Sequence, residues 1–179
     1  YGGVGYGGDE RPDLSNLYLA IEGLKASATD PKDPVWQKAL TFVNRSQNRS
    51  ESNDQPWASN DGGFVYMPGW NPPEFGGKTD SYGGMTAAGL ISLLFAGVDR
   101  NDPRIQAAYK WMTTNYTLET NPGTDARHGL FYFYNAFAKV MAAYGDAHPQ
   151  GRLGRHEYAF TDLGPDPTEE RARFARYVE

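Results

Sequence analysis

Apolar residues recur at helical spacing along most of the chain. Leu14, Leu17, Ile21 and Leu24 lie on one face of a helix predicted over residues 14–28. The same period predicts further helices, which cover 34–47, 85–97, 103–116, 132–144 and 167–178. The segments between them are polar or glycine-rich. We therefore expect an all-α fold with no sheet larger than a short hairpin.

Two kinds of helix alternate along the chain. The helices at 34–47, 103–116 and 167–178 are amphipathic, and each follows an Asp-Pro pair. An aspartate side chain accepts hydrogen bonds from the N–H groups of a helix start, and proline has its φ preset for the first helical position. The other helices follow a glycine-aromatic stretch and are apolar or rich in small residues. One of them, MTAAGLISLLFAG (85–97), is expected to be buried on several sides.

The Asp-Pro pairs indicate an internal repeat. They begin at Asp33, Asp102 and Asp166, and the second interval is only slightly shorter than the first. Such a recurrence is typical of helical repeats, in which each unit buries its face against its neighbours. Repeats at about 1–63, 64–128 and 129–179 predict one partial α/α-toroid domain of two and a half to three helix hairpins, which residues 147–179 match poorly. Trp36 and Trp111 should share the buried face of successive outer helices.

Composition excludes several classes of partner and cofactor. The chain has 179 residues, a net charge of −5 and no basic stripe, so nucleic acid is not an expected partner. It has no cysteine, which excludes disulfides and thiolate metal sites. The three histidines are too scattered for a metal site, and no cofactor is expected. The longest apolar run, at about 87–98, is too short to span a bilayer.

Several segments resemble a known repeat. They are DLSNLYLAIEGL (13–24), ALTFVNRSQN (39–48), DGGF (61–64) and SYGGMTAAGL (81–90). Over residues 1–146 the chain resembles the terpenoid cyclases and protein prenyltransferases, above all bacterial proteins with prenyltransferase and squalene-oxidase repeats. The resemblance implies that Gln47 and Phe64 tie neighbouring repeats together. Phe64 stands where the squalene-cyclase QW motif has tryptophan, and Asn115 or Asn121 stands where a second glutamine is expected.

The same resemblance implies a long apolar ligand of the isoprenoid type. Cyclases of this superfamily use an Asp-x-Asp-Asp motif and prenyltransferases use a zinc-binding cysteine, and this chain contains neither. The segment is therefore expected to lack the catalytic motif. If the full-length protein is an enzyme, the resemblance implies a terpenoid cyclase (an isomerase) or a prenyltransferase-like protein.

Two other functions remain open at this stage. One is a non-catalytic toroid that serves as a scaffold or protein-interaction module. The thioester-containing domains of complement-like proteins share this fold, but their Gly-Cys-Gly-Glu-Gln motif is absent here. The other is a sugar-active α/α barrel, which would need a carboxylate pair across its cavity, with Asp13 and Asp80 as the nearest candidates.

We expect a ligand site where the N-terminal ends of the inner helices converge, because polar groups and aromatic rings gather there. Aromatic rings also suit an isoprenoid or a carbocation. The candidate residues are Asp13, Asn16, Tyr82, Thr86, Tyr132, Tyr134 and Asn135. The competing interpretation is structural, with Asp13 as a helix cap and the aromatic residues as core. Helix 85–97 is also predicted to leave an apolar patch that binds the missing part of the toroid or a second copy.

Overall fold

All regular structure in the described part of the chain is helical. The computed structural model describes residues 2–7, 11–124 and 127–147. The chain divides into two compact units, Tyr1–Tyr144 and Gly145–Glu179. The α-helices are α1 (Leu14–Ala26), α2 (Pro34–Arg45), α3 (Gly83–Phe95), α4 (Pro103–Thr114) and α5 (Leu130–Ala147), and a short 3₁₀ helix covers Pro73–Phe75. The all-α prediction is confirmed, whereas the helix predicted over 167–178 lies outside the described residues.

Aspartate caps fix the starts of three helices. The side chain of Asp33 accepts a hydrogen bond from the N–H of Val35 at 2.8 Å, and Asp102 accepts one from the N–H of Arg104 at 2.9 Å. Proline occupies the first helical position after both. Asp13 caps α1 in the same way, without a proline. These caps explain why the predicted starts at 14, 34 and 103 are correct.

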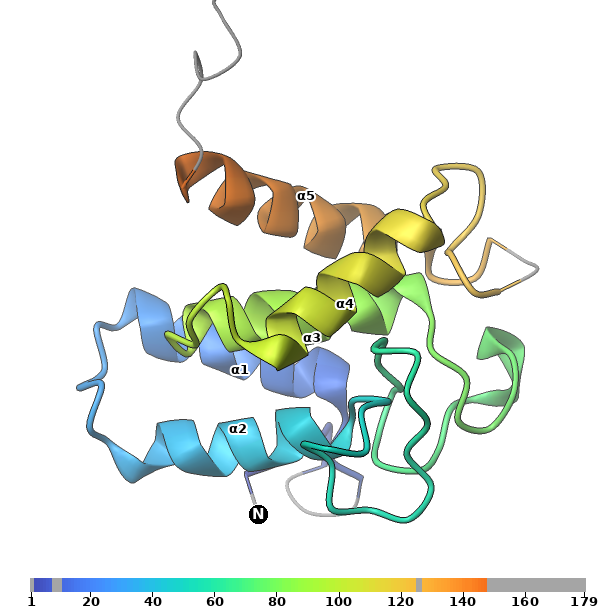
Figure 1. Cartoon of the computed structure of the whole chain (residues 1–179). Coiled ribbons are helices and arrows are strands. Elements are labelled where there is room, and N and C mark those ends of the chain that lie inside the picture. Colours follow the sequence, from blue (N-terminus) through green and yellow to red (C-terminus); the bar gives the residue numbers. More distant parts are fainter. Residues whose placement is uncertain (1, 8–10, 125–126, 148–179) are drawn as a thin grey trace, which may run out of the picture. The chain divides into compact units, whose positions relative to one another are not determined.

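The helices of the first unit alternate in direction. α1, α3 and α5 begin at one end of the unit, and α2 and α4 run back toward the other (Figure 1). The chain between α2 and α3 turns at Gly62, whose φ is +88°. A Cβ atom at this position would lie 2.6 Å from the carbonyl oxygen of Ala107 in α4. Glycine is therefore required at Gly62 by both its backbone conformation and its close approach to α4.

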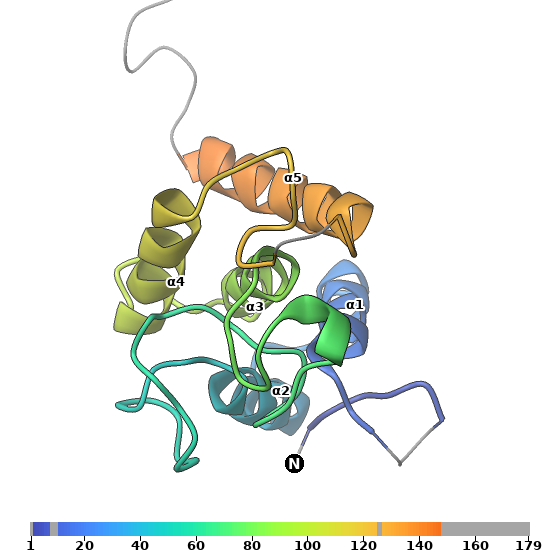
Figure 2. The same ribbon diagram turned by 90° about the vertical axis from the view of Figure 1, so that its right-hand side faces the viewer.

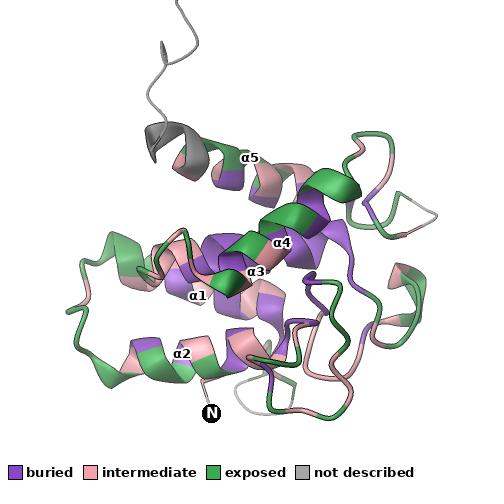
Figure 3. Ribbon diagram, viewed as in Figure 1, coloured by how far each residue is buried: buried purple, intermediate pink, exposed green. Residues whose placement is uncertain are grey.

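Helix α3 lies in the middle of the first unit. In the end-on view α1, α2 and α4 surround it, and α5 crosses above it (Figure 2). Every residue from Gly83 to Leu93 is buried, so the helix is coloured as buried along most of its length (Figure 3). The prediction that this helix is buried on several sides is confirmed. Within the described residues it does not have the open apolar face that we expected, because α1, α2 and α4 all contact it.

The buried positions of α2 and α4 correspond to one another. The buried residues of α2 are Trp36, Ala39, Phe42 and Val43, and those of α4 are Ile105, Ala108, Trp111 and Met112. Each buried residue of α2 has a buried counterpart in α4, and the sequence interval between them is the one that separates Asp33 from Asp102. Trp36 and Trp111 therefore share the buried face, as predicted, but at different heights. The counterpart of Trp36 is Ile105, and that of Trp111 is Phe42.

Helices α3 and α5 each begin two residues earlier than predicted. Gly83 and Gly84 suggested a turn, but both lie in the first turn of α3, and Tyr82 precedes them in an extended conformation. A Cβ atom on Gly83 would lie 2.5 Å from the Cδ atom of Pro122. This glycine is thus needed for close packing against the segment that leads to α5, and not for a positive φ.

Candidate functional site

A buried glutamine joins the first two helix pairs. Gln47 follows the C-terminal end of α2 and is fully buried. Its Nε2 atom donates to the carbonyl of Gly62 at 3.0 Å and to the carbonyl of Arg104, in the first turn of α4, at 2.9 Å. Phe64, two residues after Gly62, is also fully buried. A Cβ atom on Gly89 of α3 would lie 2.4 Å from its ring. Gln47 and Phe64, which the resemblance singled out in the sequence, therefore both make contacts between the helix pairs.

Arg104 adds a second link between α2 and α4. Its guanidinium donates to the side-chain oxygen of Asn44 at 3.0 Å and to both carboxylate oxygens of Asp102 at 2.8 and 2.7 Å. Hydrogen bonds from Arg104 hold the pKa of Asp102 below its ordinary value, and the same pair raises the pKa of Arg104. We call this contact between α2 and α4, with Gln47, the first junction.

A buried asparagine organises the chain between α4 and α5. Asn121 accepts from the backbone N–H of Gly84, at the start of α3, at 2.8 Å. Its Nδ2 atom donates to the carbonyl of His128, just before α5, at 3.0 Å. Asn115, the other position considered for a second glutamine, is exposed and donates to the carbonyl of Trp111. Asn121 is therefore the buried amide of this segment.

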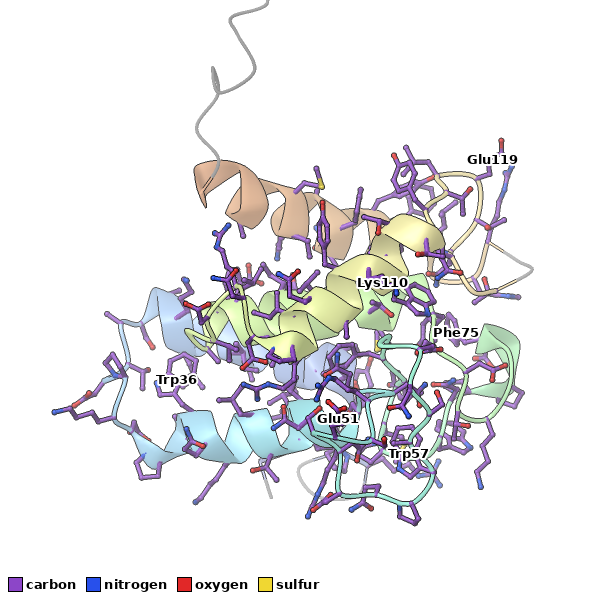
Figure 4. The ribbon with its side chains drawn as sticks, in the orientation of Figure 1. Trp36, Glu51, Trp57, Phe75, Lys110 and Glu119 are labelled. Atoms are coloured by element: carbon purple, nitrogen blue, oxygen red, sulfur yellow. The ribbon has the colours of Figure 1, made fainter. Side chains whose placement is uncertain are left out.

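Part of the predicted helix-start site does converge. Tyr82 and Tyr132 are neighbours, and Tyr18 meets Tyr132 edge-on with ring centroids 6.5 Å apart. Burial raises the pKa of Tyr82 and of Tyr132, and the nearby carboxylate of Asp13 raises both further. Phe75 of the 3₁₀ helix stacks on Tyr82 at 4.8 Å and is labelled in Figure 4. The hydroxyls of Tyr18 and Tyr132 are buried without a hydrogen-bond partner in the described structure.

The remaining helix-start candidates are held by structural contacts or point elsewhere. The carboxylate of Asp13 accepts from the backbone N–H and the side-chain amide of Asn16, which is a capping arrangement. The hydroxyl of Thr86 accepts from the N–H of Phe64 and donates to the carbonyl of Tyr82.

On α5, the hydroxyl of Tyr134 donates to the carbonyl of Leu118. Asn135 is exposed. No cavity is found at the cluster of Asp13, Tyr82 and Tyr132 among the pockets described below, so the ligand role of these residues stays a prediction.

An apolar groove opens elsewhere, between α3, α4 and α5. Its volume is about 380 Å³, within the range of small-molecule sites. The residues that line it carry no charge. They are Leu90, Tyr109, Met112, Thr113, Tyr116, Phe137, Val140 and Met141. A smaller hollow of about 200 Å³ lies between the end of α1 and the start of α2, beside Trp36 and Phe95. The larger groove is the described feature that best fits an apolar ligand.

Two residues that line the groove stand at the positions of α4 that correspond to the first-junction residues of α2. At the interval that relates α2 to α4, Thr113 is the counterpart of Asn44, and Tyr116 is the counterpart of Gln47. Thr113 directs its hydroxyl back to the carbonyls of Tyr109 and Lys110 in its own helix. Tyr116 is exposed, and its ring lies 5.8 Å from that of Phe137. We call this open contact between α4 and α5 the second junction.

Exposed apolar side chains occur on α4, on α5 and in the connection between them. Met141 is 50 % exposed and Phe131 is 86 % exposed, and Tyr109, Tyr116 and Leu118 are exposed as well. The expected apolar patch thus has its best counterpart on α4 and α5, and not on α3. Sequence reasoning missed the groove because it concentrated on helix starts. The signal was the wide apolar arc of α5, where Phe137 and Met141 extend the buried stripe at helical spacing.

The comparisons with known proteins add no neighbour. No family model, curated protein or solved structure matches the chain. In the described residues no group of three histidine, aspartate or glutamate side chains comes together as a metal site requires. The helices described here are each too short or too polar to cross a membrane.

Proposed function

We propose that this chain is an apolar-ligand-binding domain built from helical repeats of the α/α-toroid type, as in the squalene-cyclase and prenyltransferase-like proteins. The observation that carries the proposal is the uncharged groove of about 380 Å³ between α3, α4 and α5. Leu90, Met112 and Val140 form its buried floor, and aromatic rings form its sides. Such a surface favours a flexible hydrocarbon over a polar molecule. A polar ligand would lose hydrogen bonds to water on entering the groove, and the lining offers few to replace them.

Three features support the toroid-type repeat. The helices alternate in direction, the buried positions of α2 and α4 correspond one to one at the repeat interval, and Gln47 connects one outer helix to the next. A closed toroid around a central space would need more helix pairs than the described residues form. In this chain the groove would then bind a squalene-like or other isoprenoid hydrocarbon without converting it, because the Asp-x-Asp-Asp motif and the zinc-binding cysteine are absent.

The test is a binding titration with a matched pair of charge substitutions. Squalene should displace an apolar fluorescent dye from the wild-type chain and from Leu19→Glu, because Leu19 is a 54 % exposed residue of α1 that does not line the groove. Met141→Glu has nearly the same exposure but places a carboxylate in the groove. It should weaken squalene binding at least about tenfold, because a charge near the bound chain is costly to desolvate. Equal binding by the two variants would refute the groove as the site.

Catalysis is tested in the same preparation. We expect no product from squalene or from a prenyl diphosphate, and turnover of either would overturn the proposed lack of catalysis. Binding lost in Tyr82→Ala and Tyr134→Ala, but retained in Met141→Glu, would place the ligand at the predicted helix-start site.

A second candidate is a non-catalytic interaction module, and the exposed ring of Phe131 favours it. This side chain lies at the start of α5, and Tyr109, Tyr116 and Met141 of the groove are exposed as well. We call these four exposed side chains the apolar rim. We propose that the rim can bind a second copy or a further part of the toroid. Sedimentation of the wild-type chain should then show concentration-dependent association that Phe131→Glu abolishes, and monomeric behaviour of the wild type at high concentration would exclude self-association.

A further inference from the structure

The groove has a cation at one end. Arg100 lies in the connection between α3 and α4, and its guanidinium donates to the carbonyl of Ala143 in α5 at 2.5 Å. Ala143 follows the groove residue Val140 by three positions, which places both on the same face of α5, about 5–6 Å apart between their Cβ atoms. The guanidinium therefore lies beyond one end of the apolar lining, about one turn of α5 from Val140.

The position of Arg100 is held from both sides. Its backbone carbonyl accepts from the side-chain amide of Gln106 in α4 at 2.7 Å, while its side chain reaches α5. Arg100 thus contacts α4 through its backbone and α5 through its side chain, and these are two of the three helices that form the groove. An arginine held at two points loses less conformational entropy on binding an anion than a mobile surface lysine would lose.

No carboxylate neutralises Arg100 among the described residues. The neighbouring Asp99 instead accepts from the backbone N–H of Asn101 at 2.8 Å. Helix α4 contains no acidic residue, and neither does α5 up to Ala143. Lys139 of α5, by contrast, is paired with Glu22 of α1 at 2.7 Å. A guanidinium has five N–H donors, and only one hydrogen bond from the Arg100 side chain is formed within the described structure.

We propose that the groove takes an amphiphile with a single anionic head, such as a long-chain carboxylate, whose head pairs with Arg100 while its chain lies along Leu90, Met112 and Val140. The uncharged lining suits the chain, and the Arg100 cation beyond its end, which pairs with no carboxylate of the described residues, suits the head. A carboxylate and a guanidinium can form two parallel hydrogen bonds, which makes arginine well suited to this head group. This inference rests on the proposed binding of an apolar ligand in the groove, and it specifies the ligand's head group.

The experiment compares two ligands that differ only in the head group. Dodecanoate and dodecanol are titrated against the full chain, below the concentration at which either forms micelles. The wild type should bind the carboxylate about five- to tenfold more tightly than the alcohol, as expected for a charge-assisted hydrogen bond at a partly exposed site. Arg100→Gln should remove this preference and leave the affinity for the alcohol within about twofold of the wild type.

Two further variants test whether the preference comes from pairing of the carboxylate with Arg100. Lys110→Gln removes another cation of α4, labelled in Figure 4, and should keep the preference, because Lys110 does not line the groove. Arg100→Lys keeps the charge and should retain part of the preference for the carboxylate. If Arg100 only stabilises the end of α5, its substitution will lower both affinities together and leave their ratio unchanged, and this result would overturn the inference.

The remaining outcomes distinguish this inference from the proposed function. Equal affinity of the wild type for dodecanoate and dodecanol would overturn the inference and leave the apolar groove standing. Failure of both ligands to bind would overturn the two together. A carboxylate preference that is equally strong in Arg100→Gln would show that the head group binds elsewhere.

Discussion

The two junctions of this chain use equivalent positions in opposite ways. At the first junction Asn44 and Gln47 hold the first turn of α4 through polar contacts with Arg104. At the second junction the counterparts of Asn44 and Gln47 are Thr113 and Tyr116, and neither reaches across to a neighbouring helix with a hydrogen bond in the described structure. Corresponding positions therefore hydrogen-bond to the next outer helix at the end of α2 and line an apolar groove beside α5 at the end of α4. If the proposed function holds, two substitutions at corresponding positions separate a polar contact between helices from the lining of a binding groove.

The largest expected effect tests whether the two outer helices are equivalent. Phe42→Ala and Trp111→Ala truncate counterpart residues on the buried faces of α2 and α4. Each should lower the free energy of unfolding by about 3–5 kcal/mol, because a large buried ring leaves a cavity. Urea denaturation followed by circular dichroism gives the comparison. A loss below about 1 kcal/mol for Trp111→Ala alone would mean that α4 is not held as α2 is.

The next effect contrasts the two junctions directly. Gln47→Ala removes a fully buried side chain and leaves the carbonyls of Gly62 and Arg104 without their donor. We expect a loss of about 2–3 kcal/mol in the free energy of unfolding. Tyr116→Ala, at the equivalent exposed position, should cost less than about 1 kcal/mol. Similar losses for both variants in the same denaturation experiment would remove the distinction between the junctions.

The smallest effect concerns pH. Arg104 depresses the folded-state pKa of Asp102 below the value near 3.9 expected for an unfolded chain. The stabilisation is therefore present above pH 4 and is lost as the pH falls through the folded-state value. The Arg104–Asp102 pair is partly exposed. We therefore expect it to contribute about 0.5 kcal/mol to the free energy of unfolding. The gap in melting temperature between the wild type and Asp102→Asn should narrow on acidification below pH 4, and a constant gap would contradict this assignment.

The helices were predictable from the sequence because their starts are marked by local chemistry. Asp33 and Asp102, each followed by proline, define the first residues of α2 and α4 without any tertiary information. The ends of the first four helices were placed two residues too late. Their last turns close on Ser27, Ser46, Ala96 and Asn115, which continue the helical pattern in sequence. At α3 the sequence does mark the end, because Gly97 adopts a φ of +78° and the N–H of Val98 donates to the carbonyl of Leu93. The other three ends have no glycine at this position.

The candidate site was less accessible from the sequence. Asp13, Tyr82 and Tyr132 do come together, because the alternating helix directions bring the starts of α1, α3 and α5 to one end. The groove and Arg100 depend on which faces of α4 and α5 remain uncovered. That is a property of how the helices pack, and a list of polar or aromatic residues does not contain it.

The buried amides also affect how the protein ages chemically. Asn71 and Asn121 each make hydrogen bonds as donor and acceptor, and deamidation would place a carboxylate where a donor is needed. The usual route begins when the next backbone nitrogen attacks the side-chain amide. Both residues are followed by proline, Pro72 and Pro122, whose nitrogen carries no hydrogen. The two amides that organise the approaches to α3 and α5 are therefore protected from this damage by their own neighbours, even while the chain is unfolded.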